Sequence, residues 1–191
     1  MTGWVVILNG VPRSGKSSIA KALQSHGLWL NLGVDAWMAM TPEQFLPGIG
    51  LRPGGERPEL EPVVQQLYAG LFEAIAAEAR AGLDVVSDLG LHEGYSRPLG
   101  IFADAQRRLA GLPVLLVGVR CPVEVIMARR NADPQGGHYV GGEGVPAPVA
   151  RWQEAVHRGM AYDLEVNTAV MSAQACAEAI LAVLAERFPP P

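Results

Sequence analysis

The sequence contains few of the features that would tie it to an extracellular space or a membrane. Only two cysteines occur in 191 residues, and Cys121 and Cys176 stand far apart in apolar stretches. We expect two small buried thiols, with a disulfide as the alternative. No uninterrupted apolar run reaches the roughly eighteen residues of a membrane span, and the first residues lack the pattern of a signal peptide. These features favour a cytoplasmic protein without a membrane partner.

Positive charge is equally scarce. The net charge is −4, which argues against a general attraction to nucleic acid. Lysine occurs only at Lys16 and Lys21, so the chain lacks the [NT]-K-x-D motif with which GTPases recognise guanine. The histidines His26, His138 and His157 show no metal-ligand spacing with cysteine or with one another. A GTPase and a zinc module are therefore disfavoured.

What is present is enough apolar sequence for one α/β domain spanning residues 1–191. Hydrophobic residues make up 49% of the chain. Short apolar runs alternate with helical patterns, which predicts a five-stranded parallel sheet with helices on both faces. The strands are expected at 4–8, 28–33, 83–88, 113–119 and 163–168. The helices are expected at 18–24, 59–81, 97–109, 122–131, 150–159 and 172–187, the last capped by Ser172.

Two stretches rich in proline and glycine interrupt this alternation. Residues 36–58 begin with a possible helix at 36–40 and then contain repeated helix breakers. Residues 131–148 have a similar composition. Long segments of this kind commonly form binding loops and lids, so we expect a substrate-binding loop at 36–58 and a flexible lid at 131–148. The alternative for the first stretch is an ordinary surface insertion.

A phosphate-binding pattern follows the first predicted strand. Residues 10–17 match G-x-x-x-x-G-K-[ST], and the next residues look helical. In this setting the backbone N–H groups cradle phosphates, Lys16 reaches the β- and γ-phosphates, and the Ser17 hydroxyl binds Mg²⁺. Arg13 either touches phosphate or covers it. The predicted nucleotide-binding residues of this loop are Gly10, Val11, Pro12, Arg13, Ser14, Gly15, Lys16, Ser17 and Ser18.

Two carboxylates are expected at the carboxyl ends of neighbouring strands, near this loop. Asp88 ends an apolar run, where an acid can hold Mg²⁺ opposite Ser17. Asp35 is expected at the end of the second strand, where it can accept a proton from an attacking hydroxyl. The structural alternatives are a turn or N-cap role for Asp88, and a cap of the following helix for Asp35.

Three arginines are candidates for charge stabilisation. Arg129 and Arg130 end the predicted helix before the lid, where a guanidinium can reach a transferring phosphate. Either one can instead face solvent or pair with a nearby acid. Arg120 ends the fourth strand and either flanks the adenine or serves the structure alone.

The residues after Asp35 are candidates for the acceptor pocket. Trp37, Met38, Met40 and Phe45 can form an apolar pocket, or they can fill the core beneath the loop. His92 and the adjoining Glu93 follow the third strand on the same edge of the sheet. They can contact substrate, although isolated residues of this kind are more often incidental.

Several segments resemble the chloramphenicol phosphotransferase family of P-loop kinases. They are VVILNGVPRSGKSS at 5–18, WLNLGVDAWMAM at 29–40, AGLDVVSDLGL at 81–91, LLVGVRCPVEV at 115–125 and VHRGMAYDLEVNT at 156–168. The resemblance implies a three-layer P-loop kinase fold and transfer of the ATP γ-phosphate to a primary hydroxyl of chloramphenicol. It places the family's proposed base on Asp35 and the arginines of its lid near Arg129 and Arg130. The family can carry two consecutive acids on its third strand, whereas here Asp88 is followed by Leu89.

The sequence therefore predicts an O-phosphotransferase that uses ATP and Mg²⁺ and acts on a small hydroxylated molecule, with chloramphenicol or a similar antibiotic first. A kinase for another metabolite or a nucleotide is the second hypothesis. It would need fixed basic groups on the loop after the second strand, where only Arg52 and Arg57 are available. The third is a non-catalytic ATP-binding regulator. Whether the chain is a monomer or a homo-oligomer stays open.

Overall fold

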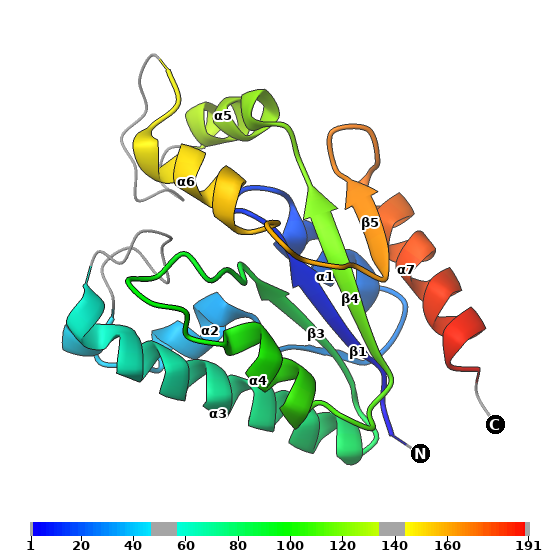
Figure 1. The fold of residues 1–191 in the computed structure, drawn as a ribbon. Helices are drawn as coiled ribbons and strands as arrows, with labels where there is room; N and C mark the ends of the chain where they lie inside the picture. The colour runs from blue at the N-terminus through cyan, green and yellow to red at the C-terminus, as the bar shows by residue number, and fades with distance from the viewer. Residues whose placement is uncertain (1, 47–56, 134–143, 190–191) are drawn as a thin grey trace.

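The computed structural model describes residues 2–46, 57–133 and 144–189, and its centre is a parallel sheet (Figure 1). The five strands lie in the order β2-β3-β1-β4-β5, and all the pairs are parallel. The strands are β1 (Val5–Asn9), β2 (Trp29–Asn31), β3 (Asp84–Leu89), β4 (Val114–Arg120) and β5 (Leu164–Asn167). The predicted five-stranded parallel sheet is confirmed. The chain continues to one side of β1 and later to the other, so the carboxyl end of β1 lies at a topological switch point.

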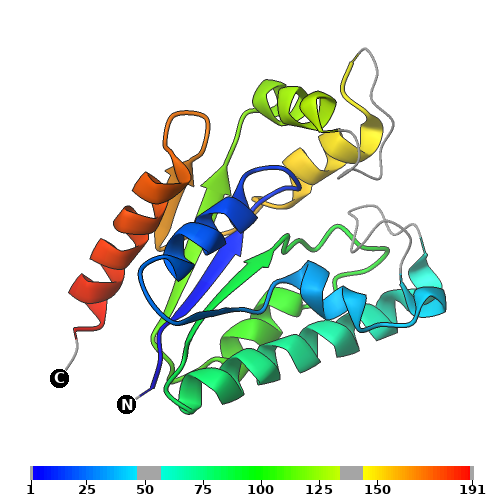
Figure 2. The same ribbon diagram turned by 180° about the vertical axis from the view of Figure 1, so that it is seen from behind.

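Helices cover both faces of the sheet (Figures 1 and 2). One face carries α1 (Lys16–Gln24) and α7 (Ala173–Arg187), and the other carries α3 (Glu61–Arg80) and α4 (Ile101–Arg108). The alternation of side chains along β1 produces this division, because successive residues of a strand point to opposite faces. Val6 and Leu8 pack with the α1 and α7 side chains, whereas Val5 and Ile7 pack with those of α3 and α4. The three-layer arrangement is confirmed.

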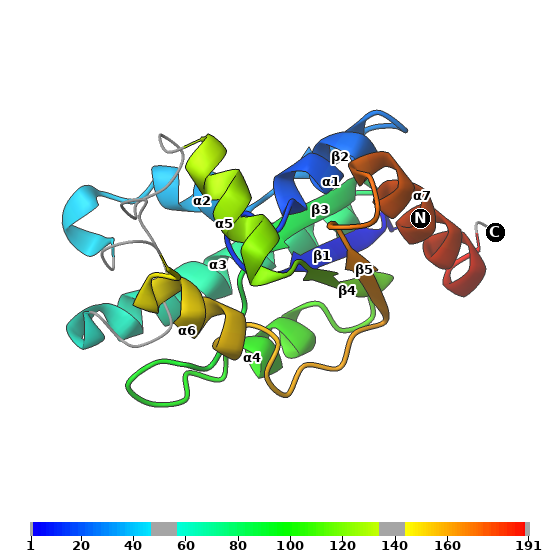
Figure 3. The same cartoon turned by 90° about the horizontal axis from the view of Figure 1, so that it is seen from above.

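Two further helices lie over the carboxyl edge of the sheet. They are α5 (Val123–Ala132) and α6 (Ala147–Ala155), seen from above in Figure 3. Ile126, Val149 and Trp152 from these helices form a small buried cluster with Val11 of the loop after β1. Ligands of parallel α/β sheets bind at this edge. Here α5 and α6 form a wall beside it, packed against the phosphate-binding loop.

The short helix α2 (Val34–Ala39) corrects the prediction for Asp35. β2 ends at Asn31 and α2 begins at Val34, so Asp35 lies in the first turn of a helix rather than at the end of a strand. Gly33 makes this abrupt change possible, because a Cβ atom there would lie 1.8 Å from Oδ1 of Asp88. The chain passes directly over the Asp88 carboxylate. This contact could not be predicted from the sequence pattern of β2.

The starts of two helices differ from the predictions by three residues or more. α4 begins at Ile101 rather than 97, because the Glu93 carboxylate accepts hydrogen bonds from the N–H groups of Leu99 and Ile101 at 2.8 and 2.9 Å. Glu93 therefore binds backbone N–H groups at the start of α4. α6 begins at Ala147 rather than 150, with Pro146 as its N-cap.

The two interrupted stretches are described only in part. Residues 36–46 include most of α2 and the 3₁₀ turn Glu43–Phe45, and a second 3₁₀ turn at Pro58–Leu60 leads into α3. Residues 47–56 of the predicted substrate-binding loop at 36–58 and residues 134–143 of the predicted lid at 131–148 lie outside the described residues. The described helices include none that is long and apolar enough to span a membrane. Cys121 and Cys176 are buried free thiols, as expected.

Candidate active site

A cavity of about 930 Å³ opens at the carboxyl edge of the sheet, beside the loop between β1 and α1. It brings together predicted residues from four separate parts of the chain. The predicted residues on its lining are Gly10, Val11, Pro12, Arg13, Gly15, Lys16, Ser17, Ser18, Asp35, Met38, Asp88, Arg129 and Arg130. The cavity therefore joins the phosphate-binding loop to both predicted carboxylates and both predicted lid arginines.

The loop folds so that α1 starts at its end. Gly15 is the N-cap of α1 and has φ 97°, a left-handed conformation that favours glycine. Arg13 also has a positive φ of 68°, which is uncommon for a residue with a side chain. The N-terminus of α1, with its free N–H groups and positive dipole end, lies on the cavity wall, an arrangement suited to binding phosphate.

Lys16 is a half-buried cation at the centre of the loop. Its Nζ donates to the carbonyl oxygens of Gly10 and Val11 at 2.8 and 2.9 Å. Burial lowers the pKa of Lys16 to about 8, against the opposing effect of the Asp88 and Asp35 charges. A buried ammonium in this state is stabilised by any further anion, so the site fits a polyphosphate.

Ser17 and Asp88 form the pair of oxygen ligands expected for magnesium. The Ser17 hydroxyl donates to Oδ2 of Asp88 at 2.7 Å, and both residues line the cavity. Asp88 is 9% exposed and its other oxygen lies beside Gly33. A hydroxyl and a carboxylate at this separation are ligands that Mg²⁺ prefers, so these residues fit the ion.

Asp35 lines the cavity from α2, together with Val34 and Met38, and its charge acts on Lys16. Trp37, two residues on, faces the other way: its ring packs against Gly70 of α3 and against the core beneath. Residues two apart on a helix point in nearly opposite directions, so Trp37 holds α2 in place while Asp35 faces the cavity. The predicted contact of Trp37 with substrate is thus replaced by a packing role.

Arg129 is tied to the phosphate-binding loop. Its guanidinium donates to the Arg13 carbonyl at 3.1 Å and to the Thr168 carbonyl at 2.8 Å. The Thr168 hydroxyl in turn donates to the Ser14 carbonyl at 2.7 Å. These bonds connect α5 and the end of β5 to two successive carbonyls of the loop, which stabilises the loop's shape.

Two other arginines belong to the same wall. Arg130 lines the cavity and is 6% exposed. Arg13 donates to Oδ2 of Asp133 at 2.9 Å and to the Asp133 carbonyl at 2.8 Å, which ties the loop to the end of α5. The positive charges of Lys16, Arg129 and Arg130 therefore lie around the loop end of the cavity, a distribution suited to phosphate.

Some predicted site residues lie elsewhere. Arg120 pairs with Glu165 at 2.6 Å and lies over the Tyr162 ring, and it is outside the cavity lining. Phe45 is 44% exposed on its 3₁₀ turn, and His92 is buried in a ring stack with Tyr95. Neither lines the described part of the cavity. Ser14 is fully buried below the loop.

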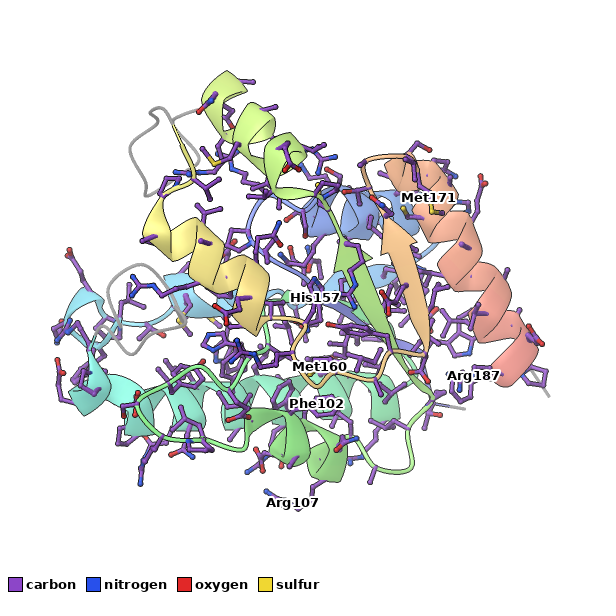
Figure 4. All side chains as sticks on the ribbon, turned by 45° about the horizontal axis from the view of Figure 1, so that its top comes forward. Phe102, Arg107, His157, Met160, Met171 and Arg187 are labelled. Atoms are coloured by element: carbon purple, nitrogen blue, oxygen red, sulfur yellow. The ribbon has the colours of Figure 1, made fainter. Side chains whose placement is uncertain are left out.

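Several cavity residues were not predicted. Thr168, Met171 and Ser172 come from the connection between β5 and α7, and Figure 4 shows Met171 beside the start of α7. Tyr68 of α3 and Trp152 of α6 line the cavity as well. Tyr68 continues the apolar stripe of α3, four residues after Val64, so that spacing was an available signal for it. The others required knowledge of how distant elements pack.

Asn9 is a further unpredicted residue, at the end of β1. Its side-chain amide donates to the Val156 carbonyl at 3.0 Å and to the Tyr162 hydroxyl at 2.9 Å, while its Oδ1 accepts from the Leu91 N–H at 2.6 Å. The Tyr162 hydroxyl lies 2.6 Å from Nδ1 of His157, whose pKa is lowered by burial to about 4 (Figure 4). The neutral ring accepts a hydrogen bond from the Tyr162 hydroxyl, and Asn9 holds this pair through its bond to the same hydroxyl.

A loop of this form between β1 and α1, at the switch point of a parallel sheet, defines the P-loop nucleotide-binding class with a kinase fold. Residues 3–185 match the family described as chloramphenicol phosphotransferase-like protein, and the chain belongs to this family. Family and fold together support a P-loop small-molecule kinase, that is, a phosphotransferase that uses a nucleotide. No significant match to a curated protein sequence was found.

Solved structures share the fold at low sequence identity. The APS kinase CysC of Mycobacterium tuberculosis, in complex with AMPPNP and APS, is similar with a TM-score of 0.65 and 17% identity, covering 96% of this chain and 98% of that one. The tunicamycin resistance protein of Deinococcus radiodurans has a TM-score of 0.60 and 17% identity, covering 99% of each chain. Shikimate kinase from Acinetobacter baumannii, in complex with shikimate, has a TM-score of 0.58 and 13% identity, covering 100% and 97%.

Proposed function

We propose that this protein transfers the γ-phosphate of ATP to a hydroxyl group of a small molecule, with chloramphenicol or a similar antibiotic as the leading acceptor. The observation that carries the proposal is the arrangement of one cavity. Lys16, the hydrogen-bonded Ser17–Asp88 pair and Asp35 all line it. A phosphate site beside a general base is the minimum that phosphoryl transfer to an alcohol requires.

The donor end binds and orients ATP. The N–H groups of the loop and the N-terminus of α1 hold the phosphates, and Lys16 balances their charge. Ser17 and Asp88 would hold Mg²⁺, which neutralises charge on the phosphates when bound. Arg129 keeps the loop in shape through the Arg13 and Thr168 carbonyls. Arg130, buried on the same wall, stabilises charge on the transferred group.

The acceptor end supplies the base. The acceptor hydroxyl oxygen forms a bond to the γ-phosphorus as the bond from that phosphorus to the bridging β-γ oxygen breaks, and ADP leaves with the electron pair. Asp35 accepts the hydroxyl proton as its acidity rises. Positioning of both substrates supplies much of the rate, because the transition state is loose and needs little covalent assistance.

The choice of antibiotic as acceptor rests on the family and on the apolar residues of the cavity. Val34, Met38 and Trp152 are on its lining, and such a surface suits a partly apolar molecule. The tunicamycin resistance protein with this fold shows that the scaffold occurs among antibiotic resistance proteins. Of the two arginines on the loop after β2, Arg52 lies outside the described residues, whereas Arg57 pairs with Glu59 at 3.0 Å and donates to the Leu46 carbonyl, which disfavours Arg57 as a binding group for a phosphorylated acceptor.

The test is Asp35→Asn, assayed by ADP release across a panel of hydroxylated antibiotics with chloramphenicol as the reference. We expect the variant to bind Mg-ATP as the parent does and to lose turnover by at least about a hundredfold, the usual contribution of a general base. Turnover within tenfold of the parent would overturn the assignment of Asp35. A parent that binds ATP and phosphorylates no compound of the panel would favour a regulator instead.

A further inference from the structure

Tyr68 lies at the cavity in a position suited to binding a ligand, and the proposed mechanism gives it no role. It belongs to α3, is only 3% exposed and lines the cavity that Asp35 faces. Its ring stacks on Phe72 with a centroid separation of 5.7 Å, which fixes the direction of the side chain. The ring is therefore part of the core, while its hydroxyl belongs to the cavity wall.

The Tyr68 hydroxyl differs from the Tyr162 hydroxyl in its hydrogen-bond partners. Tyr68 is 3% exposed and lines the cavity, and within the described residues its hydroxyl forms no hydrogen bond. The Tyr162 hydroxyl, by contrast, is held by Asn9 at 2.9 Å and His157 at 2.6 Å. A phenol on the cavity wall without a protein partner is able to form a hydrogen bond to a ligand there.

The charge beside Tyr68 indicates what kind of partner fits. Burial raises the pKa of the Tyr68 phenol well above its ordinary value, and the negative charge of Asp35 raises it further. Tyr68 is therefore a neutral hydrogen-bond donor at physiological pH. The same charge of Asp35 disfavours an anionic group in this part of the cavity.

We propose that the Tyr68 hydroxyl is a specificity-determining group of the acceptor site, donating a hydrogen bond to a second polar atom of the acceptor. This inference rests on the proposed function, since it assumes that the reacting hydroxyl faces Asp35. The acceptor class is then an uncharged molecule with at least two oxygen or nitrogen groups: the hydroxyl that is phosphorylated and a second hydrogen-bond acceptor within reach of α3. Simple monohydric alcohols fall outside this class.

The experiment compares Tyr68→Phe with Tyr162→Phe, two changes that remove only a phenol oxygen. The probes are chloramphenicol, every other compound that the parent phosphorylates, and analogues of these that lack one polar group at a time. For Tyr68→Phe we expect the acceptor KM to rise about three- to tenfold, the usual effect of one neutral hydrogen bond. We expect kcat and the Kd of Mg-ATP within about twofold of the parent, and a thermal midpoint that does not fall.

The analogues and the control separate recognition from structure. An analogue that lacks the group bound by Tyr68 should be used equally well by the parent and by Tyr68→Phe. Tyr162→Phe should lower the thermal midpoint, because Asn9 and His157 lose their partner.

An unchanged acceptor KM in Tyr68→Phe, or a loss of stability like that of Tyr162→Phe, overturns this inference and leaves the proposed function standing. A parent that phosphorylates nothing overturns the proposed function, and this inference with it.

Discussion

The two ends of the cavity are built in different ways. At the donor end, the loop at 10–17 bonds to itself through Lys16, and Thr168 and Arg129 hold its carbonyls from outside. At the acceptor end, the cavity is lined by side chains from three separate helices, α2, α3 and α6. Among the described residues, the indole nitrogen of Trp152 is buried there without a hydrogen-bond partner, and the Tyr68 hydroxyl forms no hydrogen bond.

This difference separates a preorganised site from an adaptable one. A ligand that never changes, such as a triphosphate, is best bound by donors whose positions are already determined. An acceptor that differs between related enzymes is better bound by side chains from separate helices, because each can be substituted without disturbing the loop. Changes at one end of the cavity should therefore leave binding at the other end intact.

The largest test of this separation is Asp88→Asn. The amide has one oxygen fewer for the metal and no charge, so we expect turnover to fall about a hundredfold and the Mg²⁺ concentration for half-maximal rate to rise. The acceptor KM should stay within about threefold. Initial rates measured against Mg²⁺ and against acceptor, with ATP saturating, provide both quantities.

A matched control lies at the other end of the same strand. Asp84 accepts a hydrogen bond from the Trp4 N–H at 2.8 Å, far from the cavity. Asp84→Asn should leave the Mg²⁺ dependence unchanged. If Asp88→Asn also shows the parent's Mg²⁺ dependence, Asp88 is not a metal ligand.

A smaller effect is expected from pH, through Lys16. Its pKa of about 8 means that below pH 8 the ammonium is charged both before and after ATP binds, so Kd should be flat. Phosphate raises the pKa in the complex, so above pH 8 binding must take up a proton and Kd should rise, roughly eightfold between pH 7.5 and 9. Calorimetric titrations of Mg-ATP in buffers of different ionisation enthalpy measure both Kd and proton uptake.

Two variants, one at each end of the cavity, test whether Lys16 causes this pH dependence of the Kd. Lys16→Arg keeps its charge throughout this range, so its Kd, whatever its value, should not change with pH. Tyr68→Phe should keep the parent's pH profile, because it alters the acceptor end alone. A constant parent Kd up to pH 9 would contradict the role given to Lys16.

The smallest effect is expected from Gly70→Ala in α3. The new Cβ would lie 3.2 Å from Cζ2 of Trp37, so the Trp37 ring and the helix that carries Asp35 must shift slightly. We expect kcat to fall about threefold with Mg-ATP affinity unchanged, while the better helix propensity of alanine raises stability by up to about 1 kcal/mol. Steady-state kinetics and thermal unfolding on the same samples measure these effects.

The smaller ring of Trp37→Phe provides the control. In the double variant with Gly70→Ala it should restore kcat relative to Gly70→Ala alone, because the contact is relieved. No recovery, or a full parent kcat in Gly70→Ala, would show that the Trp37–Gly70 contact does not position Asp35.

The fold was largely predictable because its signals are local. Short apolar runs and helices with an apolar stripe determine the layers. Ser172 caps α7 as its position suggested, with its Oγ accepting a hydrogen bond from the Ala175 N–H at 3.1 Å. The boundary errors arise where a distant group acts on the backbone. Glu93 shortens α4 from outside it, and Asp88 lies against Gly33 where β2 was expected to continue.

The same distinction between local signals and contacts with distant groups applies to the candidate site. The sequence by itself determined the phosphate-binding loop, since its two glycines, Lys16 and Ser17 lie within eight residues of one another and form a local motif. Only the tertiary structure decided that Asp35 enters the cavity from a helix, that Trp37 packs away from it, and that Thr168 and Tyr68 line its walls. Contacts between residues far apart in the chain depend on how the layers of the fold pack. The pattern of residues along the sequence does not show which distant residues come together.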